Sequence, residues 1–175
     1  MKNLIIAILF LGSVFSISAQ KDMTAEERYE WRLKQEKLYG IYIPRDLTDA
    51  FVELNKRIDA ESKAKFKNAP EDLVAKKLHF SLGRWMMVNW GFYEGSRLTA
   101  FLNKLDIHHP DDMARFLIIT FHRSINRTPL EVKSLVEDLK VKRSELEQDR
   151  LLQGEILHQE TRLREPIDST GQKGS

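Results

Sequence analysis

The side chains best suited to chemistry are concentrated between residues 79 and 123 of the sequence. They are imidazoles, carboxylates and one guanidinium: His79, His108, His109, Asp111, Asp112, His122 and Arg123. Imidazole and carboxylate groups are ligands for zinc, and a carboxylate beside a second ionisable group can acquire a shifted pKa suited to proton transfer. One hypothesis is therefore a metal-dependent or acid–base hydrolase. It would use His109, Asp111 and Asp112, with His108 and either His79 or His122 in support.

The spacing of these residues argues against that hypothesis. Adjacent histidines in extended chain point to opposite sides, and Asp111 and His122, eleven residues apart, would lie about 16 Å apart along a helix. The sequence has no H-E-x-x-H, G-x-S-x-G, G-x-G-x-x-G or phosphate-binding loop. A structural explanation accounts for the same residues: His109 or a neighbour caps a helix, Pro110 occupies its first turn, and Asp111 and Asp112 complement its dipole. We prefer this explanation, and we expect no metal and no cofactor.

A second cluster, rich in aromatic residues, could form a binding cleft. Its members are Trp85, Trp90, Phe92 and Tyr93, with Arg84, Arg97 and Glu94 as polar neighbours. Stacked aromatic rings with a charged rim suit sugar or peptide ligands. Because Trp85 lies among apolar residues and glycines flank the aromatic run, we prefer a core role. Trp85, Trp90, Phe92, Tyr93, Arg84 and Arg97 remain the candidate binding residues.

Capping and apolar spacing predict the helices that position these side chains. Thr24 and Glu27 form a capping box, which predicts a surface helix that ends near Tyr39, with Gly40 as a left-handed stop. Asp46 caps a second helix with one apolar stripe. The basic, weakly patterned segment 61–68 is predicted to be a frayed end and linker.

Further helices are predicted to begin at Pro70, Ser96 and Pro110. The last of these is apolar almost all round, which predicts the most buried element. From Leu130 to about Arg164 the pattern indicates one long amphipathic helix, whose irregular heptads leave pairing with a second copy open. No convincing strand is evident. The predicted fold is an all-α, compact helical bundle of about five to six helices with a long amphipathic C-terminal helix.

The N-terminus has the layout of a cleavable secretory signal. Lys2 is followed by an apolar run from Leu4 to Phe15 and a small-residue exit. This run is shorter than the about 20 apolar residues of a spanning helix. We expect cleavage after Ala19, with Ser18 as the alternative, and no stable membrane anchor after cleavage.

Composition limits the function further. The chain has no cysteine, which removes disulfides and thiolate chemistry, and its formal net charge is only +2. So balanced a charge is not typical of a nucleic-acid-binding protein. The expected organisation is a signal peptide (1–19), an N-terminal surface helix (20–40), a helical core domain (41–127), a long C-terminal helix (128–165) and a disordered tail (166–175).

Several sequence blocks resemble a bacterial family of domains of unknown function. They are Ile43–Leu47, Leu78–Trp85, Asn89–Gly91, His109–Met113 and His122–Arg123, which contain H-F-x-x-G, W-G and H-P-D-D-M motifs. The similarity covers about Ile41 to Arg127. It implies a recurring helical domain but no reaction, and it marks seven residues to test first: His79, Gly83, Trp90, His109, Asp111, Asp112 and His122. Met87 and Val88 depart from the Arg-Asn pair expected in the family.

Together these observations predict an exported protein of the periplasm or the extracellular space that acts by binding rather than catalysis. The expected partner is an envelope protein, or a second copy that pairs through the C-terminal helix. One alternative is the hydrolase that uses the His109/Asp111/Asp112 region. Another is an immunity-like protein that neutralises a toxin in the envelope.

Overall fold

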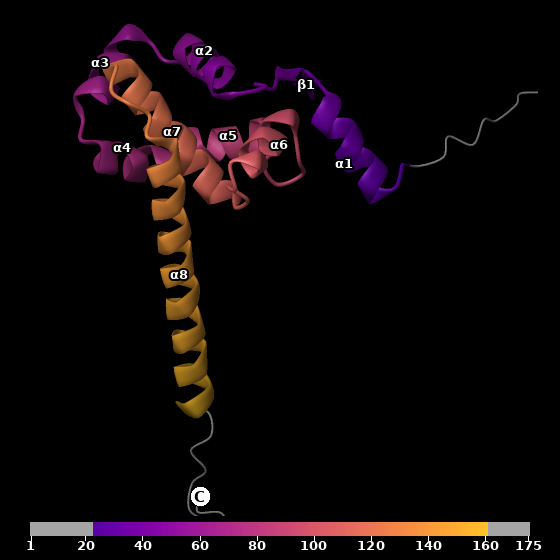
Figure 1. The fold of residues 1–175 in the computed structure, drawn as a ribbon, viewed down its shortest axis with the longest axis vertical. Coiled ribbons are helices and arrows are strands. Elements are labelled where there is room, and N and C mark those ends of the chain that lie inside the picture. The colour runs from indigo at the N-terminus through magenta and orange to yellow at the C-terminus, as the bar shows by residue number, and fades with distance from the viewer. Residues whose placement is uncertain (1–22, 161–175) are drawn as a thin grey trace, which may run out of the picture.

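The computed structural model describes residues 23–160, with side chains described through Gln153. The predicted signal peptide and tail lie outside these residues. The elements are α1 (Ala25–Lys34), β1 (Lys37–Leu38), β2 (Ile41–Tyr42), α2 (Leu47–Arg57), α3 (Ala60–Asn68), α4 (Glu71–Leu78), the π-helix η1 (His79–Gly83), α5 (Arg84–Asn89), α6 (Arg97–Lys104), α7 (Pro110–Asn126) and α8 (Val132–Glu160). The predicted all-α fold with a long C-terminal helix is confirmed. Helices α2 to α5 pack around α7, α1 lies to one side against α6, and α8 runs away from the body (Figure 1).

Helix α7 is the centre of the core, as its apolar sequence predicted. Its buried side chains face neighbours on several sides: Met113, Ala114, Phe116, Leu117, Ile118, Ile119, Thr120, Phe121 and His122. Helices α2, α3, α4, α5 and α8 all pack against it. The one fully buried hydroxyl in this set, on Thr120, donates to the Phe116 carbonyl at 2.7 Å, so that its burial leaves no polar group unpaired.

The predicted helix starts are present. Thr24 and Glu27 form the capping box of α1, and the side chains of Asp46 and Ser96 accept hydrogen bonds at the starts of α2 and α6. At α7 the cap is the imidazole of His109, which accepts from the Asp111 amide, with Pro110 in the first turn. These side chains satisfy amide groups that have no partner within the helix, and so they fix where each helix begins.

The end of the first helix was predicted wrongly. Helix α1 ends at Lys34, and the chain then forms a two-stranded antiparallel hairpin in which Lys37 pairs with Tyr42 and Leu38 with Ile41. The turn residues Tyr39 and Gly40 both have positive φ, the backbone that a tight hairpin requires. Gly40 is therefore a turn residue and not a helix stop.

The segment predicted to be a linker is also a helix. Asp59 caps α3 by accepting from the Ser62 amide, and Phe66 is the buried anchor of this helix. A single apolar anchor among many lysines gives almost no periodic signal, which is why the sequence pattern did not indicate α3.

Helix α8 is packed only along its first three turns. Leu135, Val136 and Leu139 are buried against the body, whereas every described side chain from Ser144 to Gln153 is exposed. Figure 1 shows this part of α8 projecting alone from the rest of the fold. Among the described residues, no helix is long and apolar enough to cross a membrane.

Candidate functional site

The first two predicted site residues meet where η1 crosses the start of α7. The Nε2 atom of His79 lies 3.2 Å from Oδ1 of Asp111. Helices α4 and α5 are joined by the π-helical turn that contains His79, and such turns alter the register of a helix and are frequent at functional sites. Two segments more than thirty residues apart in the sequence thus supply one imidazole–carboxylate pair.

Asp112 and His109 are held by a residue that the sequence did not single out. Arg143 of α8 donates to both carboxylate oxygens of Asp112, at 2.9 and 2.8 Å, and its Nη2 lies 2.9 Å from Nδ1 of His109. Hydrogen bonding to Asp112 raises the pKa of Arg143 above its ordinary value, against the opposing effect of burial. This pair fastens α8 to the beginning of α7.

These groups surround a shallow cavity of about 320 Å³. Its lining includes His79, Asp111, Asp112, Arg115 and Arg143, and two exposed apolar side chains, Phe80 and Leu146. A histidine–aspartate pair can act as a general base when a nucleophile is within reach. The neighbouring hydroxyl of Ser81 instead donates to the Leu78 carbonyl at 3.4 Å. No group of three or more His, Cys, Asp or Glu residues within the described part of the chain is placed to hold a metal ion.

The other two histidines of the predicted cluster, His108 and His122, lie elsewhere. His108 contacts Asp106, whose pKa is lowered by hydrogen bonds from Lys140 and from His108. His122 lies at the other end of α7, where Nε2 is 3.1 Å from the Ala69 carbonyl oxygen and Nδ1 is 3.9 Å from Glu71. The structure therefore brings together His79, His109, Asp111 and Asp112, and it leaves His122 out of this group.

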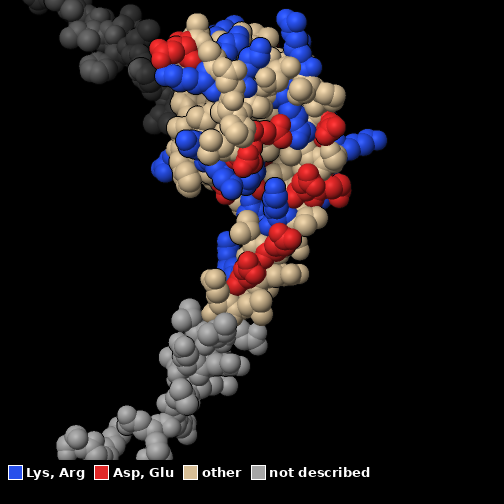
Figure 2. Space-filling model, turned by 90° about the vertical axis from the view of Figure 1, so that its left-hand side faces the viewer, with Lys and Arg blue, Asp and Glu red and all other residues tan. Residues whose placement is uncertain are grey.

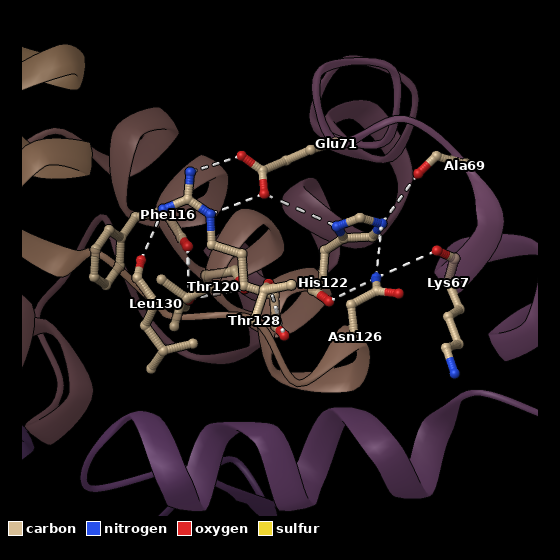
Figure 3. Close-up of polar contacts among 11 residues, drawn as sticks. Lys67, Ala69, Glu71, Phe116, Thr120, His122, Asn126, Thr128 and Leu130 are labelled. Atoms are coloured by element: carbon tan, nitrogen blue, oxygen red, sulfur yellow. Dashed lines mark hydrogen bonds and ion pairs between the residues drawn. The ribbon is translucent and has the colours of Figure 1, made fainter.

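His122 belongs to a separate cluster that holds the corner between α3 and α4 (Figure 3). Arg123 donates to both carboxylate oxygens of Glu71, at 2.8 and 2.7 Å, and to the Leu130 carbonyl at 2.7 Å. Asn126 donates to the Lys67 carbonyl at 3.2 Å. The hydrogen bond to Glu71 raises the pKa of Arg123, and the partners on both sides make this cluster a joint between helices.

The aromatic cleft is not formed as an open surface. Trp90 is fully buried and Phe92 is 4% exposed, so both rings belong to the core, the role that the sequence favoured over a cleft. Trp85 contacts Trp90 edge-on at 5.5 Å, and the Arg57 guanidinium covers its ring at 4.2 Å. Arg97 is also engaged, since it donates to the Ile43 carbonyl at 2.7 Å. Arg84 and Tyr93 are the exposed members of the set, and the Tyr93 hydroxyl contacts the sulfur of Met87.

The glycines of the aromatic turn have a structural role that also involves α1. Gly95 has φ +88°, and a Cβ atom there would lie 2.3 Å from the Tyr29 ring; one at Gly91 would lie 2.9 Å from Nη2 of Arg32. Arg32 is buried, donates to the Gly95 carbonyl at 3.0 Å and pairs with Glu94 at 2.8 Å. The sequence predicted a surface helix here and did not single out this arginine. A buried arginine on a polar helix has no periodic signal to reveal it.

Fold and site together define an all-α domain in which the predicted site residues His79, Asp111, Asp112 and His122 join one element to another. Residues 43–125 match the model of a domain of unknown function, DUF6794. The predicted resemblance over about Ile41 to Arg127 is confirmed. No curated protein and no solved structure matches the chain. Helices α1 and α8 lie outside the matched residues, and the contact between Arg143 and Asp112 joins α8 to the matched segment.

Proposed function

We propose that the chain is an exported, non-catalytic binding protein that contacts its partner through the projecting part of α8, residues 144–160. Export is supported by the apolar leader and its small-residue exit in the sequence. Binding is supported by one structural observation: this part of α8 presents large apolar side chains that nothing in the described chain covers.

The exposed side chains on this part of α8 are Leu146, Leu151 and Leu152, which are 59%, 73% and 58% exposed. A helix that packs against nothing is only marginally stable in water, because most helical stability in proteins comes from burial of an apolar face. Among the described residues, nothing covers this part of the helix. A second protein that covered it would gain the burial of these leucines.

An exposed apolar side chain of the body lies beside the root of α8. Phe80, which is 83% exposed, lines the same cavity as Leu146 at the root of the projection. Clustered exposed apolar side chains with polar neighbours are typical of contact surfaces. A partner helix that lies along α8 would end against Phe80.

The charges of this surface suit a partner helix of mixed charge. Figure 2 shows acidic and basic side chains interspersed over the face that it presents and down α8. Arg143 and Arg150 flank three acidic residues, Glu145, Glu147 and Asp149. Such a mixture of both signs favours a helical partner of an envelope protein, or a second copy of this chain, over a partner with a single sign of charge.

A catalytic role has less support. Asp112 accepts hydrogen bonds from Arg143, His109 caps α7 and contacts Arg143, and Asp111 pairs with His79. A side chain that already accepts two interhelical hydrogen bonds has less capacity to bind a substrate or exchange a proton.

Photocrosslinking in the native host tests the proposal. A photoreactive phenylalanine analogue is placed at Leu151, and in a matched control at Val52, which is 48% exposed on α2. We expect a discrete crosslinked product from position 151 and none of that size from position 52. Equal labelling from both positions, or none from 151, would contradict the proposal. Light scattering of the purified mature chain then tells a second copy from a different protein.

A further inference from the structure

An open groove between α3 and α4 has apolar walls and a basic rim. Its volume is about 440 Å³, within the range of small-molecule sites. Its walls are formed by Ile58, Phe66, Leu73, Val74, Leu78 and Leu82. It shares no lining residue with the cavity beside His79 and Asp111 and none with α8, and so it is independent of the surface proposed above.

The groove is preformed, because contacts with α7 hold both Phe66 and the connection between α3 and α4 in place. The Phe66 ring packs on Phe121 at 5.4 Å and edge-on against His122 at 5.2 Å. The cluster in Figure 3 anchors the last residues of α3 and the first of α4 to α7, through Asn126, His122 and Arg123. The joint made by these polar residues thus holds the two helices apart in a fixed geometry.

The charged groups on the groove are both cationic. Lys65 of α3 and Lys77 of α4 line it, and no acidic side chain does. Lys65 also reaches Glu61 at 2.6 Å, but both side chains of that pair are more than 70% exposed, where water and salt weaken the attraction. An anionic group at the rim would therefore meet two ammonium groups.

The walls favour an alkyl chain over a peptide. Ser62 carries the one uncharged polar side chain among the lining residues, so the walls offer few hydrogen-bonding groups. The backbone amides of an extended peptide would lose water there without replacement, which costs free energy, whereas methylene groups have no hydrogen bonds to lose.

We infer that this groove binds a free long-chain fatty acid, with the alkyl chain between α3 and α4 and the carboxylate at Lys65 and Lys77. The attraction is electrostatic at one end and hydrophobic along the chain. Binding is therefore expected to weaken with added salt and with loss of either feature.

Titration of the full mature chain with cis-parinaric acid, a fluorescent fatty acid, tests the inference. We expect saturable binding that the double variant Lys65→Gln/Lys77→Gln weakens about three- to tenfold, the effect of two exposed charge contacts. The matched control Lys67→Gln/Lys76→Gln removes the same charge one or two residues away, outside the groove, and should change the affinity less than twofold. Parinaric acid methyl ester, which lacks the carboxylate, should bind equally to all three proteins.

A second pair of variants tests the groove itself. Ser62 is exposed and lines it, so that Ser62→Trp should fill it and lower the affinity more than tenfold, whereas Ala64→Trp on the same helix should not. Thermal melting verifies that each variant is folded. No saturable binding by the wild-type chain, or equal losses in the groove and control variants, would overturn the inference.

Discussion

The contact between Asp112 and Arg143 offers the sharpest test of whether these side chains serve the architecture. Arg143 makes two hydrogen bonds to the carboxylate, at 2.9 and 2.8 Å, and the two side chains are 18% and 22% exposed. The pair is therefore neither freely solvated nor fully buried. It joins α7 to α8 near the point where α8 leaves the body.

The size of its contribution follows from these values. Two unit charges about 4 Å apart attract by roughly 4 kcal/mol at an effective dielectric constant of about 20, but lost hydration and side-chain ordering consume most of this. Exposed pairs retain about 0.2–1 kcal/mol. For a half-buried bidentate pair we expect a coupling free energy of about 1–2 kcal/mol, and a loss of about 1.5–3 kcal/mol of unfolding free energy for Asp112→Asn or Arg143→Met alone.

A double-mutant cycle measured by urea denaturation gives the coupling directly. The comparison is the exposed pair Glu61 and Lys65, four residues apart on α3, for which about 0.3–0.5 kcal/mol is expected. A coupling at Asp112 and Arg143 no larger than that of the exposed pair would refute the structural role. So would a stoichiometric metal ion that is lost in both single variants.

Three further predictions concern the glycine turn before α6, the buried Arg32 and the stability of the protein at low pH. Gly95→Ala should lower the unfolding free energy by about 1–3 kcal/mol, because φ is +88° and the new Cβ would lie 2.3 Å from the Tyr29 ring. The matched variant Gly83→Ala, whose Cβ would lie 3.5 Å from that of Ala114, should change it by less than about 1 kcal/mol. Chemical denaturation compares the two variants. Arg32→Met should cost about 1–3 kcal/mol and increase proteolysis within α1, since the buried Gly95 carbonyl loses its donor; unchanged proteolysis would mean that α1 is held by other contacts. The carboxyls of Asp49 and Asp106 have pKa values below the ordinary 3.8. Burial raises the pKa of Asp49, but hydrogen bonds from Tyr42 and the Arg45 amide, together with the nearby charges of Arg45 and Arg97, outweigh it. At Asp106 the hydrogen bond from Lys140 lowers the pKa. The stabilisation by these two carboxylates is present above pH 3.8 and is lost as the pH falls through their lower pKa values in the folded protein. The melting temperature should therefore decrease as the pH is lowered from about 4, and it should decrease less steeply in Asp106→Asn. Parallel curves of melting temperature against pH for the two proteins would contradict this prediction.

Local chemistry in the sequence was a good guide to where helices begin. Thr24, Asp46, Ser96 and His109 each cap a helix as expected, because a cap depends only on residues within the next turn. The ends and turns were harder. The hairpin after α1 requires Tyr39 to adopt a left-handed backbone conformation, and a tyrosine at this position does not indicate such a conformation.

The candidate site could be predicted only in part. His109 as cap, and Asp111 and Asp112 in the first turn of α7, follow from local sequence. The partners do not, because Arg143 and His79 reach these residues from elements more than thirty positions away in each direction. The aromatic residues show the same limit. The sequence around a tryptophan does not indicate whether its ring faces solvent or, as at Trp90, the core.

Hydrogen exchange along α8 tests the central claim, that the projecting part of this helix depends on a partner for its cover. In the purified mature chain at low concentration, amides of residues 135–142 should exchange slowly, because their hydrogen bonds lie in the packed part of α8. Those of residues 145–153 should exchange almost as fast as an unstructured chain, because a helix without packing opens readily. When the chain is captured with its crosslinking partner, or concentrated if that partner is a second copy, residues 145–153 should become protected. Slow exchange of this segment in the dilute, isolated monomer would contradict the claim.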